Sequence, residues 1–204
     1  DVTLKKEYHQ GWIANAEAGG GTKDKYLGRV FGTYFSDRAR VSFYGNANNT
    51  NSNQRAGTDG KWENEDAMMG ENTLQEGGLF ASFYGGKDSE RPIRFITTLE
   101  ASHNKDVNES RENSVNFYES GNTYGKVNSL YNSKNYNLNW IGALSIPTSF
   151  AYIHLDQYFY YASSSTNSQQ QSVLSRHILP DEWTNMTEGL VNSYTDLSQS
   201  KASN

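Results

Sequence analysis

Residues 137–165 read NLNWIGALSIPTSFAYIHLDQYFYYASSS, and this stretch decides the fold class. In its first half the residues alternate between the two sides of an extended chain. One side has more polar groups, and the other carries the uncharged residues Leu138, Trp140, Gly142, Leu144 and Ile146. After residues 147–149 the alternation resumes, with an uncharged face of Ala151, Ile153, Leu155, Phe159 and Tyr161. A period of two is the side-chain period of a strand and not of a helix. The stretch therefore predicts a hairpin of two long strands.

The length of these arms is compatible with two kinds of sheet. Each arm has about nine residues or more, whereas strands of soluble proteins average about five or six. A tilted strand that crosses a bilayer needs about 9 to 11 residues. The hairpin fits a membrane barrel as well as a soluble sheet, so the rest of the chain has to decide between them.

The composition excludes a helical membrane protein and leaves both sheets open. Only 35% of the 204 residues are hydrophobic and the mean hydropathy is -0.82, so the chain has no apolar run long enough for a spanning helix. A transmembrane barrel exposes only alternate residues to lipid, and its average can stay polar. The 14 Tyr, 9 Phe and 4 Trp suit either interfacial aromatic girdles or a sugar-binding surface.

Cysteine content, charge and the start of the chain restrict function further. With no cysteine there is no disulfide, thiol nucleophile or thiolate metal site. The net charge of -5 gives no reason to expect a nucleic-acid partner. The chain starts at Asp1 in strand-like sequence without an export signal, which predicts a fragment whose signal was removed or lies outside this sequence.

The same alternation recurs along the chain and predicts an all-β fold. Strands are predicted at residues 12–18, 25–35, 39–48, 77–85 and 93–102, besides a short one at 1–8 and a lead into the hairpin from residue 124. Residues 1–165 would then form about seven or eight strands of an antiparallel up-and-down meander, as part of a transmembrane β-barrel. Residues 166–204 are predicted to be a polar extracellular loop segment, in which Pro180 and Asp181 could start a short helix.

The predicted connections alternate between short and long. Short turns are expected at residues 36–38, 86–91 and 147–149, and long polar loops at 49–76, at 103–123 and after 165. The turn at 19–24 belongs to the long-loop end and is a mild exception. Every second connection of an antiparallel meander lies at the same end, and bacterial outer-membrane barrels combine brief turns at one end with extended loops at the other. A soluble Greek-key sandwich has no need of this asymmetry.

The first part of the chain also resembles a known family. The matching pieces are residues 2–6, the Gly11 and Trp12 pair, the glycines at 19–21, the tight turn at 36–40 and the Asn-rich stretch at 45–53, with a looser likeness through SGNTYG at 120–125. In this order they resemble the start of the barrel in TonB-dependent receptors and related outer-membrane β-barrel proteins of the Bacteroidetes type.

This resemblance implies a TonB-coupled importer of a scarce nutrient, such as a glycan, a metal chelate or a peptide, in the bacterial outer membrane. The implied partners are outer-membrane lipid, an unknown nutrient ligand, and TonB through parts outside this chain. No plug domain and no TonB box lie in these residues, and about eight strands are too few for the barrels of that family. The chain would be an N-terminal slice of a barrel, without catalysis or cofactor.

No residue of the chain lies in a pattern that predicts a catalytic, cofactor or metal site. Asp59, Glu63, Glu65 and Asp66 cluster around Trp62 and could bind Ca²⁺, but their spacing matches no EF-hand and favours a solvated acidic loop. Four histidines, at positions 9, 103, 154 and 177, show no metal-ligand spacing. His154 and Asp156 are predicted to share the polar face of one strand, as a dyad or as ordinary polar lining.

The remaining motifs indicate no enzyme. A GxSxG motif is absent, and Gly19–Gly20–Gly21 before Thr22 and Lys23 lacks the Walker spacing and predicts a turn. No pattern in the sequence points to the paired carboxylates of a glycosidase. Some aromatic residues are candidates for membrane-interface anchors, with plain strand packing as the alternative: Trp12, Tyr26, Tyr34, Trp140 and Phe159.

A second function stays open beside the barrel: a soluble extracellular β-sandwich that binds carbohydrate through exposed Tyr and Trp. In that case the uncharged faces would be buried against a second sheet. In the barrel they would face lipid, and the chain expressed alone would aggregate or need detergent because both sheet edges would be open.

Overall fold

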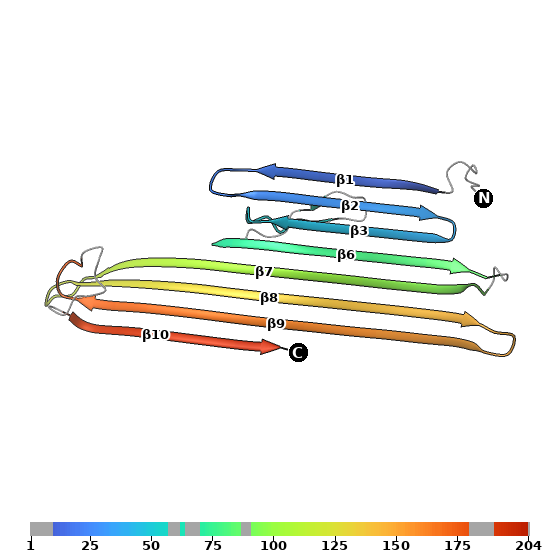
Figure 1. The fold of residues 1–204 in the computed structure, drawn as a ribbon. Coiled ribbons are helices and arrows are strands. Elements are labelled where there is room, and N and C mark those ends of the chain that lie inside the picture. Colours follow the sequence, from blue (N-terminus) through green and yellow to red (C-terminus); the bar gives the residue numbers. More distant parts are fainter. Residues whose placement is uncertain (1–9, 57–61, 64–69, 87–90, 180–189, 204) are drawn as a thin grey trace.

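The protein forms one eight-stranded antiparallel sheet whose strand order follows the sequence, β1-β2-β3-β6-β7-β8-β9-β10 (Figure 1). The computed structural model describes residues 10–56, 62–63, 70–86, 91–179 and 190–203. The strands of this sheet are β1 (Gln10–Gly20), β2 (Tyr26–Ser36), β3 (Ala39–Asn48), β6 (Glu71–Gly85), β7 (Ile93–Asn116), β8 (Thr123–Pro147), β9 (Tyr152–Ser175) and β10 (Leu190–Ser203). A separate pair joins β4 (Arg55–Ala56) to β5 (Trp62–Glu63). The predicted all-β antiparallel meander is confirmed.

The hairpin at residues 137–165 is confirmed as parts of β8 and β9. Its register pairs Leu138 with Tyr161 and Ile146 with Ile153. At the turn, the Thr148 backbone N–H donates to the Ala151 carbonyl at 2.8 Å, and the Thr148 hydroxyl accepts from the Ala151 N–H at 2.9 Å. Ala151 therefore lies in the turn, and the uncharged face of the second arm begins at Ile153.

The register brings the uncharged residues of neighbouring strands onto one face of the sheet. Directly opposite residues of antiparallel strands share a face. One continuous row of such partners is Ala14, Gly32, Phe43, Leu79, Leu99, Trp140 and Phe159. The rows on either side have the same character, with Gln157 as an exception. We call this surface, from residues 12–18 of β1 to residues 153–161 of β9, the apolar belt, and the other side of the sheet the polar face.

No second layer covers the apolar belt among the described residues. Its large side chains are exposed: Trp12 by 72%, Phe159 by 48% and Leu99 by 40%. Figure 1 shows the strands of the sheet as a single layer. The two-layer packing that a β-sandwich requires is thus not found in the part of the chain that the structure describes. β1 and β10 form the edges and do not pair with each other, so the described sheet is open.

The predicted long loop at residues 103–123 is wrong. Residues up to Asn116 continue β7, the next strand starts at Thr123, and only residues 117–122 connect the two. The polar composition of this region lowers its β-propensity, but each strand pairs with the other over its whole length, from Asn116 with Thr123 to Arg94 with Ser145. Mutual pairing of two equally polar segments overrides the composition.

Two other predicted boundaries also differ. The first long loop ends before Glu71 instead of after Glu76, because residues 71–76 pair with β7. In the predicted loop segment 166–204, residues up to Ser175 belong to β9 and Leu190–Ser203 forms β10, so most of the described part is strand; residues 176–179 lie outside the strands. The strand predicted at 1–8 and the helix start predicted at Pro180 and Asp181 lie outside the described residues.

The strands have different lengths, and the extra length lies at one end. β7, β8 and β9 have 24 or 25 residues, about 80 Å at about 3.3 Å per residue, and extend beyond β1, β2 and β3 (Figure 1). β10 pairs only with this extension of β9, from Ser163 to Ser175. The short turns at residues 37–38 and 148–151 lie at the other end. The predicted difference between the two ends is therefore present, but the long end consists largely of extended strands and not of loops. No helix in the described residues could span a membrane.

Candidate functional site

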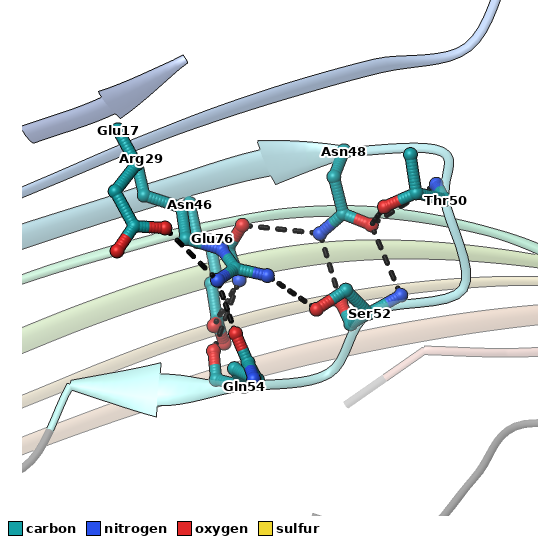
Figure 2. Close-up of polar contacts among 8 residues, drawn as sticks. All are labelled: Glu17, Arg29, Asn46, Asn48, Thr50, Ser52, Gln54 and Glu76. Atoms are coloured by element: carbon teal, nitrogen blue, oxygen red, sulfur yellow. Dashed lines mark hydrogen bonds and ion pairs between the residues drawn. The ribbon is translucent and has the colours of Figure 1, made fainter. Parts of the chain in front are cut away.

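The polar face carries most of the buried polar side chains of the molecule. They include Arg29, Asn46, Asn48, Asn72, Ser82, Ser133 and Ser145. Their burial in a single-layer sheet has a local cause at β2 and β3, where residues 49–54 fold back over the polar face (Figure 2). A segment that folds onto a sheet face can shape a binding surface, and side chains of the sheet hold this one in place.

Arg29 of β2 is the centre of this arrangement. Its guanidinium donates to the Gln54 side-chain oxygen and to the Ser52 hydroxyl, and it pairs with Glu17 of β1 at 3.4 Å (Figure 2). The ring of Trp62 lies 5.3 Å from the guanidinium carbon, a distance at which cation–π attraction is significant. The Arg29 side chain is only 5% exposed. A buried cation is costly unless it is paired, and these partners provide the pairing.

Two asparagines of β3 hold the same segment. The Asn48 amide donates to the Ser52 carbonyl at 2.8 Å and to the Asn46 side-chain oxygen at 3.0 Å, and its own oxygen accepts from the backbone N–H of Thr50 and Ser52 at 3.2 and 3.3 Å (Figure 2). Asn46 donates to the Gln54 carbonyl at 3.1 Å. Asn48 is fully buried and has no access to water, so its polar atoms depend on these hydrogen bonds.

A second cluster fixes the far end of the loop. The Asn51 side-chain oxygen accepts from the Asn72 backbone N–H at 2.9 Å. The Asn72 amide in turn donates to Asn104 at 2.6 Å and to Asp106, both on β7. Asn51 has a positive φ of 59°, a left-handed conformation that asparagine tolerates better than most residues. The loop is therefore tied to β2 by Arg29 and to β3 and β6 by asparagines, and Asn72 extends these contacts to β7.

Beside this loop the polar face is hollowed into a trough across β6, β7, β8 and β9. Two adjoining cavities of about 340 and 140 Å³ share Glu76, Ser102 and Asn137. Glu100 and Asn139 line the smaller cavity, and Asn135 and Ser164 line the larger one. We call this surface the polar trough. The carboxylates only accept hydrogen bonds when ionised, whereas the amides and hydroxyls both donate and accept.

The trough contains one polar atom that lacks a partner. The Asn139 side-chain oxygen is buried and accepts no hydrogen bond from any described residue. Asn139 lies directly opposite Glu100 in the register. Because two neighbouring acceptors need donors from outside, and no Lys or Arg of the described residues lines the trough, it favours ligands that present hydroxyl or cationic donors over anions.

The predicted acidic cluster falls mostly outside the described residues. Asp59, Glu65 and Asp66 are not described, whereas Glu63 lies exposed on β5. The ring of Trp62 lies against the Arg29 guanidinium. Within the described residues no three His, Asp or Glu side chains come close enough to hold a metal ion.

The three histidines that the structure describes do not come together. His9 is not described, His103 stacks on Tyr136 with ring centres 4.2 Å apart, and the His177 N–H donates to the Ser175 hydroxyl at 3.0 Å. His154 lies 3.1 Å from Asp156, so the predicted pair on one strand face exists.

Ser145 joins this pair from the neighbouring strand, at 2.8 Å from His154 Nδ1. Sequence reasoning missed it because cross-strand neighbours are not close along the chain. The three residue types are those of a hydrolase triad. Ser145 is only 5% exposed, however, and lies inside a strand whose N–H groups serve the sheet, so a substrate carbonyl has neither access nor an oxyanion hole there.

The glycine turn is shorter than predicted, because Gly19 and Gly20 belong to β1, whereas the aromatic residues lie on the predicted face. Residues 21–25 form a turn, with the Gly21 N–H donating to the Lys25 carbonyl at 2.8 Å and with positive φ at Lys23 and Asp24. By register, all five proposed anchors lie on the same face as the apolar belt; they are Trp12, Tyr26, Tyr34, Trp140 and Phe159. Trp12 and Tyr34 are in ring contact at 4.9 Å. Their role as interface anchors stays a prediction.

Comparison with known proteins gives no assignment. No protein-family model, no curated protein and no solved structure matches the chain.

Proposed function

We propose that this chain is a segment of an outer-membrane β-barrel of the TonB-dependent-receptor kind that takes part in nutrient uptake. The apolar belt would face lipid, the polar face would line the interior, and the extended ends of β7, β8 and β9 would project from the cell. The open edges of the described sheet would be closed by further strands of the complete protein. The chain has no catalytic role in this proposal.

The apolar belt is the observation that carries the proposal. It covers about nine residues of most strands, which at about 3.3 Å per residue and a tilt of about 40° gives a height of about 23 Å, close to the ~25 Å apolar band of outer-membrane barrels. A monomeric soluble protein rarely exposes a continuous apolar surface of this extent. In lipid the same exposure is favourable, and a closed sheet leaves no backbone group unpaired.

The polar face supports a role in ligand capture. A polar interior is usual for such barrels, and the loop that Arg29 holds against the polar face would narrow the interior next to the polar trough. The acceptors of the trough favour a neutral, hydroxyl-rich ligand or a cationic one. Among nutrients, oligosaccharides and basic peptides have this chemistry.

The proposal is tested by location and by binding. In its native host, the complete natural protein should fractionate with the outer membrane and migrate differently on gels before and after heating. Purified in a non-ionic detergent, it should bind members of a panel of neutral oligosaccharides and basic peptides. Glu100→Gln should weaken that binding, whereas the matched variant Glu112→Gln, on the same strand but outside the trough, should not. Recovery in a soluble fraction would refute the proposal.

A further inference from the structure

Three lysines lie in a row on the face of the sheet that carries the apolar belt. Lys105 of β7 is directly opposite Lys134 of β8. Lys134 in turn is opposite Ser165 of β9, and Ser165 is opposite Lys201 of β10. Because directly opposite residues share a face, the three side chains, which we call the lysine row, point to the side on which the belt lies.

The positive charge of the lysine row has no counterpart within the described residues. Like charges directly opposite each other destabilise a sheet. None of the three lysines forms an ion pair or a hydrogen bond there. The nearest carboxylate on this face by register is Glu71, which is diagonal to Lys105 and makes no ion pair with it. An anion from outside the chain would relieve this repulsion.

An apolar groove adjoins the lysine row on the side of the belt. It has a volume of about 900 Å³ and crosses the sheet from β2 to β9, with small residues such as Gly45, Gly77 and Ala101 as its floor. On the side of the lysines it is bordered by His103 and Tyr136, whose rings stack. Lys105 and Lys134 are the next residues on the same face of β7 and β8. Cationic groups and an apolar groove are thus adjacent.

We propose that the lysine row and this groove together bind a phosphate-bearing membrane lipid, with phosphate at the lysines and an acyl chain in the groove. The inference rests on the proposed function, because it requires the belt to lie in a membrane. A membrane lipid fits better than free phosphate, since only a lipid would use the groove. The lysine row lies at the border of the belt from which β7, β8 and β9 extend, and in the proposed topology this border is in the outer leaflet.

The charge half of the proposal is tested with lipid A as the probe. The complete natural protein in dodecyl maltoside should bind lipid A more tightly than the same glycolipid without phosphates, as measured by native mass spectrometry. Lys105→Gln, Lys134→Gln and Lys201→Gln should each weaken binding about fivefold. Lys126→Gln, on the same face of β8 but farther from the belt, should leave it unchanged. Equal effects of all four variants would overturn the proposal.

The groove half needs a variant that fills the floor. Ala101→Leu should weaken binding of lipid A, and Ala14→Leu, on the belt but outside the groove, should not. If inorganic phosphate competes at the row as strongly as lipid A and Ala101→Leu has no effect, the row is a free anion site and the lipid proposal is wrong.

The lysine variants should not melt earlier in lipid-free detergent, since they remove a repulsion. Earlier melting in step with the loss of binding would indicate a structural role and overturn the proposal. If this protein is located in the outer membrane but fails these lipid-binding tests, the lipid proposal is wrong and the proposed function is unaffected.

Discussion

At the scale of single residues, Arg29 explains how a polar loop stays on the face of a sheet. A lone cation in an otherwise uncharged strand was visible in the sequence, but its partners were not. Glu17, Ser52 and Gln54 come from a neighbouring strand and from a loop, and only the register and the return of the loop bring them within contact. Hydrogen bonds to a charged group are stronger than those between neutral groups, so Arg29 should dominate the stability of this region.

Replacement of Arg29 by Met should release the loop. The variant keeps much of the apolar stem but loses the ion pair with Glu17 and the hydrogen bonds to the Ser52 and Gln54 side chains. We expect a loss of about 1 to 3 kcal/mol in the free energy of unfolding. Trypsin should then cut faster after Arg55, which follows the clamped segment. Arg40→Met, an exposed position on β3, serves as the control. Unchanged cleavage at Arg55 would show that Arg29 does not hold the loop.

At the scale of strands, aromatic rings pack over glycines directly opposite them. A Cβ added at Gly78 would lie 2.3 Å from the Tyr44 ring, and one at Gly32 would lie 2.6 Å from the Phe43 ring. In both pairs the glycine and the aromatic residue are register partners. The glycines therefore provide room for a flat aromatic contact between strands, which helps to fix the register.

Gly78→Ala should consequently destabilise the sheet. The Tyr44 ring would have to move, at a cost of about 1 to 3 kcal/mol, and the loss should appear as a lower urea midpoint for unfolding. Gly28→Ala is the matched control, because its nearest neighbour would be 3.9 Å from the new Cβ. If both variants unfold at the same urea concentration, the ring contact contributes nothing.

Strand boundaries also mark what the sequence could and could not predict. The alternation of uncharged with more polar residues located the belt segment of each strand. A strand with one apolar face shows this period of two whether that face meets lipid or a protein core. It failed at residues 103–116 and 123–136, where both faces are polar and no period is visible. Those segments are strands only because they pair with each other, and such partner information is absent from local sequence.

Trypsin treatment of intact cells tests these revised boundaries. Cleavage should occur in the connections, after Arg55 and Arg176, whereas Lys105, Arg111 and Lys134 should be protected by the pairing of β7 and β8. A protected strand extension differs from a long loop in this respect, although both would be outside the cell in the proposed topology. Rapid cleavage at Lys105 or Lys134 would mean that these residues lie in a loop. Cleavage at Arg38, in the short turn at the opposite end of the sheet, would mean that this end is outside the cell.

At the scale of the whole molecule, the sheet has two features that water does not tolerate well. Within the described residues, one is the exposed apolar belt, and the other is the unpaired edge along the apolar half of β9, since β10 pairs only from Ser163 onward. Closure of the sheet within a membrane, as we propose, would accommodate both features.

The chain expressed by itself should therefore aggregate in plain buffer and stay dispersed only in detergent. Light scattering with and without dodecyl maltoside measures this directly. A monodisperse soluble monomer without detergent would mean that the belt is covered by residues outside the described part, as the sandwich alternative requires.

The most direct test of the central claim is the environment of successive residues along β7. The chain has no cysteine, so single cysteines at residues 94–101 of the complete protein, reconstituted in bilayers, can each carry one spin label. If the belt faces lipid, relaxation by oxygen should peak at positions 95, 97, 99 and 101, while a water-soluble nickel complex should act preferentially on labels at the positions between them. Low oxygen accessibility at Phe95 and Leu99, as in a packed protein interior, would contradict the account.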